Sequence, residues 1–166
     1  MRLVTRGDLD GLTSAIIITM KEKIDEILLV HPQEITDKAV EITPNDILAN
    51  VPYHPKCGMW FDHHLLTASN ERPPESFKGR YGLAPSAARL VFDYYSERDP
   101  NDEALKRLST LVDEMKKVRL EIAESCAAID RVSEEDVIAR VFYVVGSELR
   151  GVETIRFIDE RFKPLQ

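Results

Sequence analysis

Two clusters of acidic and histidine residues, far apart in the chain, carry the side chains best suited to chemistry. The first contains Asp8 and Asp10, and the second consists of Asp62, His63 and His64. Carboxylate oxygens with one or two imidazoles suit Mn²⁺, Mg²⁺ or Zn²⁺ better than a redox copper site. The two clusters together therefore predict a site for a divalent metal ion.

The elements that must position these clusters are short apolar runs that end in turn residues. Four runs have the composition of strands, at residues 3–5, 27–30, 47–49 and 59–61, and residues 12–23 have the apolar spacing of a helix. Strands that alternate with helices indicate a parallel sheet with right-handed crossovers. Because ligands bind at the carboxyl ends of such strands, we expect the two clusters to converge there.

The second half of the chain has a different character. Residues 67–82 are rich in Pro, Ser, Glu and Gly and predict a long irregular loop, and a helix should open at 84–86 and run to about residue 95. A further helix is expected from residue 101 to 129, followed by two short strands at 141–145 and 154–158. The predicted fold is thus α/β, a mostly parallel sheet flanked by helices, with a C-terminal helical segment and a small strand pair.

Composition excludes several classes of protein. The chain has 166 residues, of which 43% are hydrophobic, which argues for a folded domain. A formal net charge of −7 argues against a broad nucleic-acid-binding surface. The sequence has no apolar signal region or membrane-length run, and Cys57 and Cys126 form no Cys-x-x-Cys pair, so a cytoplasmic protein without membrane contact is expected.

The two motifs, Thr5-Arg6-Gly7-Asp8-Leu9-Asp10-Gly11 and Asp62-His63-His64, resemble those of the DHH phosphoesterase superfamily. This superfamily includes RecJ-type exonucleases, oligoribonucleases, cyclic-dinucleotide phosphodiesterases and exopolyphosphatases. The resemblance covers residues 1–115 as a DHH-like domain. It leaves residues 116–166 as a helical and strand extension, without the Gly-rich substrate loop of the second domain that such enzymes usually carry.

The resemblance implies roles for the residues of both motifs. Such enzymes hold Mn²⁺ or Mg²⁺ and use a metal-activated water to attack phosphorus. Asp8 would then serve one ion, and Asp10 and His63 the other. His64 would donate to the substrate phosphate, and Asp62 would orient its neighbours or bind metal.

Further residues complete the expected site. The last carboxylate ligand is best matched by Asp113, with Asp99 and Asp102 as alternatives. The residues expected to bind substrate are Arg80, Ser86 and Arg89, with Lys78 as a further cation. The expected partner is a phosphate-containing small molecule or a short polyanion, and self-association through the helix at 105–129 would give a homodimer.

The chain departs from the family pattern at two positions. Arg6 stands where the family usually has His or Asp, and Asn50 aligns with a bridging Asp that binds metal at the end of the third strand. Together these changes make the site about two charge units more positive, roughly what one divalent cation would supply. The sequence therefore favours one bound ion over two, with Arg6 in the place of the first.

The sequence leaves two alternatives open. Asp8 and Asp10 could simply cap the helix that follows them, because Asp favours the first turn of helices. The preferred function is metal-dependent hydrolysis of a phosphoester or phosphoanhydride, closest to exopolyphosphatase-related members. The alternative is a catalytically impaired DHH protein that only binds a phosphate- or nucleotide-bearing ligand.

Overall fold

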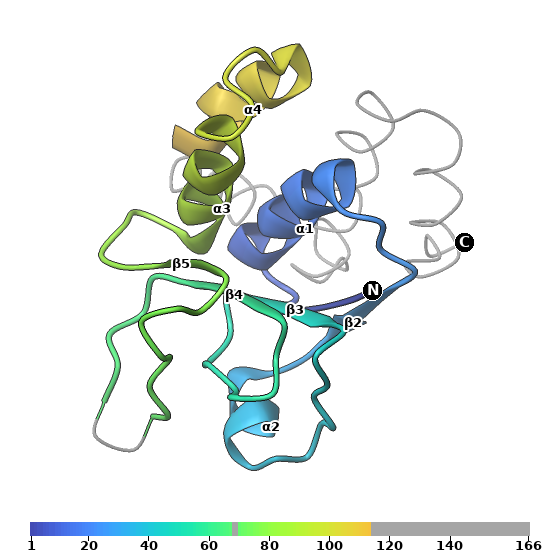
Figure 1. Cartoon of the computed structure of the whole chain (residues 1–166), viewed down its shortest axis with the longest axis vertical. Helices are drawn as coiled ribbons and strands as arrows, with labels where there is room; N and C mark the ends of the chain where they lie inside the picture. The colour runs from blue at the N-terminus through green and yellow to red at the C-terminus, as the bar shows by residue number, and fades with distance from the viewer. Residues whose placement is uncertain (68–69, 114–166) are drawn as a thin grey trace, which may run out of the picture. The chain divides into compact units, whose positions relative to one another are not determined.

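In the computed structural model, which describes residues 1–67 and 70–113, the strands of this part form one parallel sheet with helices on both faces (Figure 1). The strands are β1 (Arg2–Thr5), β2 (Glu26–Leu29), β3 (Asp46–Ala49), β4 (Met59–Asp62) and β5 (Gly79–Tyr81), in the spatial order β2-β1-β3-β4-β5. The helices are α1 (Leu9–Lys21), α2 (Pro32–Thr36), α3 (Ala87–Ser96) and α4 (Glu103–Asp113). Every neighbouring pair of strands is parallel, which confirms the predicted α/β class.

The two faces of the sheet are covered by different helices. Helices α1, α3 and α4 lie on one side and α2 on the other (Figure 1). On the α2 side, Val4, Leu48 and Trp60 form one cluster with Ile35 of α2. On the opposite side, the ring of Phe61 packs edge-on against Tyr94 of α3. Burial on both faces explains why β1, β3 and β4 are mostly apolar in sequence.

Two helices begin at side chains that cap them. The Asp8 carboxylate accepts a hydrogen bond from the Gly11 backbone at 2.9 Å, so α1 starts at Leu9, earlier than the predicted residue 12. Ser86 caps α3 in the same way, by accepting from the Arg89 backbone at 3.0 Å. Both caps place a helix N-terminus next to the carboxyl ends of the strands.

The region predicted as an irregular loop, residues 67–82, contains strand β5, so that prediction is wrong at its C-terminal end. The strand is short and begins at Gly79, whose φ is +117° and whose Cβ, if it had one, would lie 1.9 Å from the carbonyl oxygen of Trp60. Only glycine fits so close to a neighbouring strand. An edge strand of three residues, Gly-Arg-Tyr, carries too little apolar pattern to be predicted from sequence.

Helix α2 was also not predicted. It is a single short turn of helix after β2, capped by His31 and Glu34 in a capping box. Its five residues carry too little periodicity for a sequence pattern to register. Of the helix predicted from residue 101 to 129, the described part is α4, and the strand pair and the extension at 116–166 lie outside the described residues.

No helix in the described part of the chain has the length and apolar character needed to cross a membrane.

Candidate metal and phosphate site

The two sequence clusters meet at the carboxyl ends of the strands, as predicted. Nε2 of His63, which follows β4, lies 3.3 Å from Oδ2 of Asp10, in the first turn of α1. The same carboxylate accepts hydrogen bonds from the backbone of Ala87 at 2.9 Å and Ala88 at 2.8 Å, at the start of α3. Asp10 therefore joins α1, α3 and the segment after β4.

The orientation of the His63 ring is fixed from its other side. Nδ1 of His63 lies 3.1 Å from the backbone carbonyl of Ala84, which can only accept, so Nδ1 carries a hydrogen and Nε2 faces Asp10. The hydrogen bond to Asp10 raises the pKa of His63, against the opposing effect of burial. A carboxylate thus faces a ring nitrogen that holds either a proton or, when neutral, a lone pair suited to a metal ion.

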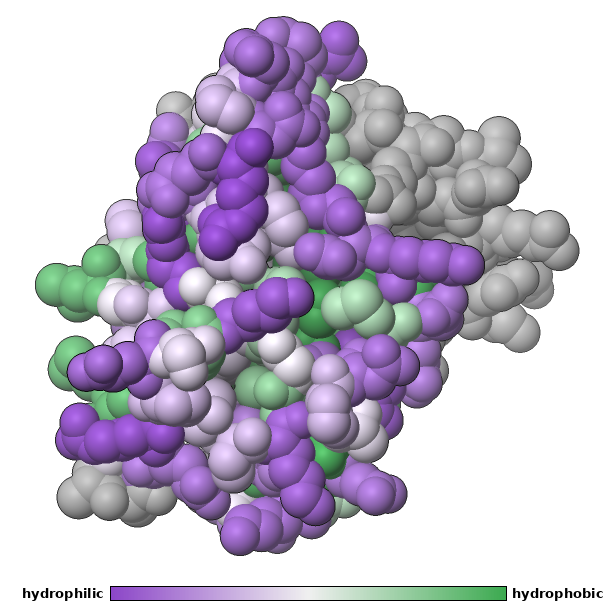
Figure 2. Space-filling view, viewed as in Figure 1, coloured by the Kyte–Doolittle hydropathy of each residue, from purple (hydrophilic) through white to green (hydrophobic). Residues whose placement is uncertain are grey.

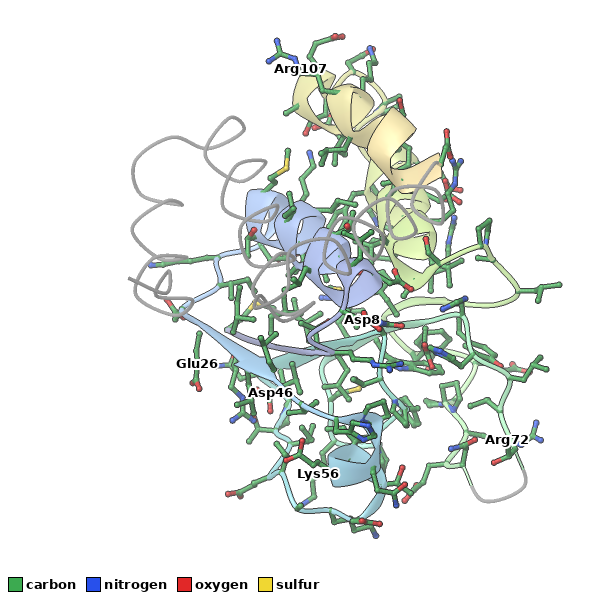
Figure 3. All side chains as sticks on the ribbon, turned by 180° about the vertical axis from the view of Figure 1, so that it is seen from behind. Asp8, Glu26, Asp46, Lys56, Arg72 and Arg107 are labelled. Atoms are coloured by element: carbon green, nitrogen blue, oxygen red, sulfur yellow. The ribbon has the colours of Figure 1, made fainter. Side chains whose placement is uncertain are left out.

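Asp8 has a different set of partners. Its Oδ1 accepts from Nδ2 of Asn50 at 2.8 Å and from the Gly11 backbone at 2.9 Å. Its Oδ2 lies 3.1 Å from Nε of Arg6. One carboxylate is thus held by a guanidinium, an amide and a helix N-terminus. Figure 3 shows Asp8 at the start of α1, and Asp46 at the opposite end of the sheet.

Asn50 is held in an unusual conformation. It directly follows β3, has a φ of +57° and is 2% exposed. Its backbone N–H donates a hydrogen bond to the backbone carbonyl of Phe61 at 2.9 Å. Asn tolerates this left-handed backbone better than most residues. Its Oδ1 atom is buried with no hydrogen-bond partner in the described part of the chain, because the amide is turned so that Nδ2 serves Asp8.

Asp62 and His64 form a second pair. Asp62 is 3% exposed, and its Oδ1 accepts from the His63 backbone at 3.0 Å and lies 2.7 Å from Nδ1 of His64. The His64 side chain is 52% exposed, so its ring is anchored at one nitrogen while the rest reaches solvent. A buried carboxylate therefore orients an exposed imidazole, a geometry suited to donating a proton or a hydrogen bond.

The remaining predicted residues lie in other contacts. Arg80 forms a forked ion pair with Glu97, at 2.9 and 2.5 Å. Arg89 pairs with Asp93 at 2.8 Å and with Asp113 at 2.5 Å. The structure therefore places Asp113 against a cation and does not bring it to Asp10, and Ser86 lies at the cap of α3.

The alternative carboxylates for the last metal ligand are also engaged elsewhere. Asp99 pairs with Lys21 at 3.1 Å, and Asp102 contacts the same lysine and caps the start of α4 through the Ala104 and Leu105 backbones. Among the described residues, no group of three or more His, Cys, Asp and Glu side chains has the arrangement of a metal site.

Asp10 and His63 are the described side chains that would hold a divalent ion. Asp10 and His63 offer an oxygen and a nitrogen that face one another, and Mg²⁺-like ions commonly keep several water ligands beside one or two carboxylates. Asp8 offers less, because both of its oxygens are already engaged by fixed donors. The predicted Asn50 ligand holds Asp8 through its nitrogen.

Backbone groups of this site were not predicted. The Ala84 carbonyl and the Ala87 and Ala88 N–H groups hold His63 and Asp10, and no side-chain pattern signals them. The only sequence signal was the helix start at Ser86, because a helix N-terminus carries free N–H groups that attract anions. In this chain the anion is Asp10 itself.

Comparison with known proteins finds one similar solved structure of known activity. No family model matches the chain, and no curated protein matches it. Among solved structures it is similar to the pGpG-specific phosphodiesterase PggH from Vibrio cholerae, with a TM-score of 0.57 and 25% identity. The match covers 98% of this chain and 59% of PggH, so the chain spans less than two thirds of that protein.

The fold is similar to that of a phosphodiesterase of the DHH family, which confirms the predicted resemblance. That phosphodiesterase is PggH.

Proposed function

We propose that this chain hydrolyses a phosphodiester bond in a short nucleotide-like substrate, with one Mn²⁺ or Mg²⁺ ion bound between Asp10 and His63. The observation that carries the proposal is the 3.3 Å approach of His63 Nε2 to Asp10 Oδ2, which unites the two motifs at one edge of the sheet. When bound, a divalent cation supplies a water of lowered pKa and neutralises charge on the phosphoryl oxygens.

The residues of the chain hold and orient the reacting groups. In the reaction, a water oxygen bonds to phosphorus, the bond from phosphorus to the leaving oxygen breaks, and that oxygen gains a proton. With both of its ring nitrogens protonated, His64 donates through Nδ1 to Asp62 and offers Nε2–H to a phosphoryl oxygen. Asp62 keeps the imidazole in this orientation.

A phosphodiester is favoured over polyphosphate by two exposed side chains. Leu65 is 80% exposed and Leu83 is 92% exposed, although Figure 2 shows a face dominated by hydrophilic residues. Leu65 directly follows His64, and Leu83 directly precedes Ala84, whose carbonyl holds His63. Apolar groups beside a phosphate site suit a sugar or base, whereas an inorganic polyphosphate has no apolar part to contact them.

Neighbouring contacts hold the backbone on both sides of Leu65. The backbone N–H of the next residue, Leu66, donates to the Tyr81 hydroxyl at 3.2 Å, and its side chain packs against the cluster around Trp60. The segment is therefore anchored on both sides of Leu65, at His64 and at Leu66. The backbone that carries the exposed Leu65 is therefore held directly after His64.

One observation favours the second candidate, a DHH protein that binds a phosphate ligand without turning it over. Asp8 is saturated by Arg6, Asn50 and Gly11, so a reaction that requires two ions would not proceed. The test is Mn²⁺-dependent cleavage of pGpG, pyrophosphate and polyphosphate by the purified chain. Cleavage of pGpG supports the proposal, and release of phosphate from polyphosphate alone supports the exopolyphosphatase-like prediction. Ligand-induced thermal stabilisation without turnover supports the binding protein.

A further inference from the structure

We infer that Arg6 is a built-in cation that takes the place of a second metal ion, and that its guanidinium binds the substrate phosphate. This inference rests on the proposed function, because it concerns the same edge of the sheet. The site would then hold two positive charges of different kinds. One is a metal ion that can leave, bound at Asp10 and His63, and the other is the Arg6 guanidinium beside Asp8.

The first support is the saturation of Asp8. Arg6 engages one oxygen at 3.1 Å, while Asn50 and the Gly11 backbone engage the other at 2.8 and 2.9 Å. A metal ion at Asp8 would have to displace the guanidinium and would meet the N–H groups of Asn50, which repel a cation. The carboxylate is therefore already neutralised within the protein.

The second support is the unused part of the guanidinium. Arg6 approaches Asp8 through Nε, and its two Nη groups make no hydrogen bond to a protein acceptor among the described residues. The side chain is 41% exposed, so these groups are open to a ligand. An arginine fork presents two parallel N–H donors that match two phosphate oxygens, a geometry a lysine cannot reproduce.

The third support is that the backbone fixes Arg6 in position. A Cβ on Gly11 would lie 2.0 Å from the carbonyl oxygen of Arg6, so the chain packs there as closely as glycine allows. Thr5 is tied to β3 by a 2.9 Å hydrogen bond from its Oγ1 to the Ala49 carbonyl. The backbone of Arg6, directly after β1, is therefore held in place, which suits a residue that must bind a phosphate.

The inference can be tested by restoring the negative charge that a second metal ion would need. Replacing Arg6 by a neutral metal ligand and Asn50 by a carboxylate lowers the local charge by two units, the charge of one divalent ion. Asp is nearly isosteric with Asn and also tolerates the left-handed backbone at this position. The double variant Arg6→His, Asn50→Asp should therefore bind one more Mn²⁺ ion per chain than the wild type.

The experiment is a count of bound Mn²⁺ by equilibrium dialysis of the full chain, with thermal unfolding as a check that each variant folds. The matched control is Arg72→His, Asn45→Asp, which makes the same charge change at exposed positions away from the site and should leave the count unchanged. A folded double variant with no additional ion overturns the inference, as does a wild type that binds two ions. A wild type without any ion, or without turnover, refutes the proposed function and leaves the difference between variant and wild type as a separate result.

A second variant tests the phosphate contact without depending on metal number. Arg6→Lys keeps the charge but removes the fork, so binding of inorganic phosphate should weaken about 10-fold, roughly the loss of one charge-assisted hydrogen bond. The control Arg72→Lys should bind phosphate as the wild type does. Unchanged phosphate affinity in a folded Arg6→Lys protein overturns this part of the inference.

Discussion

The His63 ring and the Asp10 carboxylate meet at 3.3 Å, and each is held from behind by backbone groups of the segment that opens α3. The Ala84 carbonyl holds His63, and the Ala87 and Ala88 N–H groups hold Asp10. The start of α3 therefore holds the His63 ring and the Asp10 carboxylate in position before any ligand binds. Preorganisation of this kind is what a metal or phosphate site requires.

The substitution Asp10→Asn should reduce Mn²⁺-dependent turnover by at least about 100-fold, because it removes the charge that faces His63. It should also weaken Mn²⁺ binding measured by calorimetry. The control is Asp37→Asn, which removes an equally charged group at the end of α2. Equal Mn²⁺ affinity in the Asp10 variant and the wild type would refute the assignment of this carboxylate.

The substitution His64→Asn should separate turnover from metal binding. Because His64 faces solvent and contacts Asp62 rather than Asp10, its loss should lower kcat by about 10- to 100-fold. The Mn²⁺ affinity should stay within about twofold, since no proposed ligand is lost. The matched control is His54→Asn, at a histidine in the loop before β4, and it should change neither quantity. A His64 variant that loses metal binding would show that His64 is itself a ligand.

Gly79→Ala should destabilise the fold through the edge strand. The added Cβ would lie 1.9 Å from the Trp60 carbonyl, and the φ of +117° disfavours alanine, so we expect a loss of about 1–3 kcal/mol in the free energy of unfolding. The control Gly7→Ala meets nothing closer than 3.7 Å and should be nearly neutral. Urea denaturation of both variants provides the comparison. If the two lose equal stability, β5 does not pack as described.

Asp46 should make stability sensitive to acid. Burial disfavours its charge, but hydrogen bonds from Arg2 at 2.8 and 2.7 Å and from the Thr43 backbone outweigh that effect and lower the pKa of Asp46. A carboxylate whose pKa is lowered in the folded state stabilises the protein at pH values above its ordinary pKa of 3.8. This contribution to stability is lost as the pH falls through the pKa of the folded state.

The variant Asp46→Asn tests this pH dependence by chemical denaturation from about pH 2 to about pH 7, a range that includes the titration of carboxyl groups. The difference in stability between wild type and variant should be largest near neutral pH and shrink below the ordinary pKa. Asp37→Asn, at an exposed carboxylate, should show a smaller and flatter difference. A difference for Asp46→Asn that does not change with pH would contradict the stated role of its charge.

The sequence predicted the parts of this fold that rest on burial and capping. The runs at β1 to β4 are apolar because both faces of the sheet are covered, and Ser86 has the side chain of a helix cap. Strand β5 was not predicted because it is defined by the close approach of the Gly79 backbone to β4. Helix α2 was not predicted because it is a single turn. Neither feature depends on a repeated side-chain pattern.

The site was predictable where side chains define it and not where the backbone or long-range pairing does. The meeting of Asp10 and His63 follows from strand ends in a parallel sheet, which the apolar runs predicted. The pairing of Arg89 with Asp113 depends on how α3 and α4 pack, and no spacing in one sequence reveals it. The contact of Arg6 with Asp8 was not predicted either, although the altered charge at Arg6 and Asn50 was.

The most direct test of the central claim is a crystal structure of the full chain grown with Mn²⁺, with the ion located by its anomalous scattering. The account predicts one Mn²⁺ peak within coordination distance of both the Asp10 carboxylate and His63 Nε2, with Arg6 still paired to Asp8. A manganese ion bound at Asp8 with Arg6 displaced, or no ion at Asp10 and His63 in a crystal soaked to saturation, would contradict it.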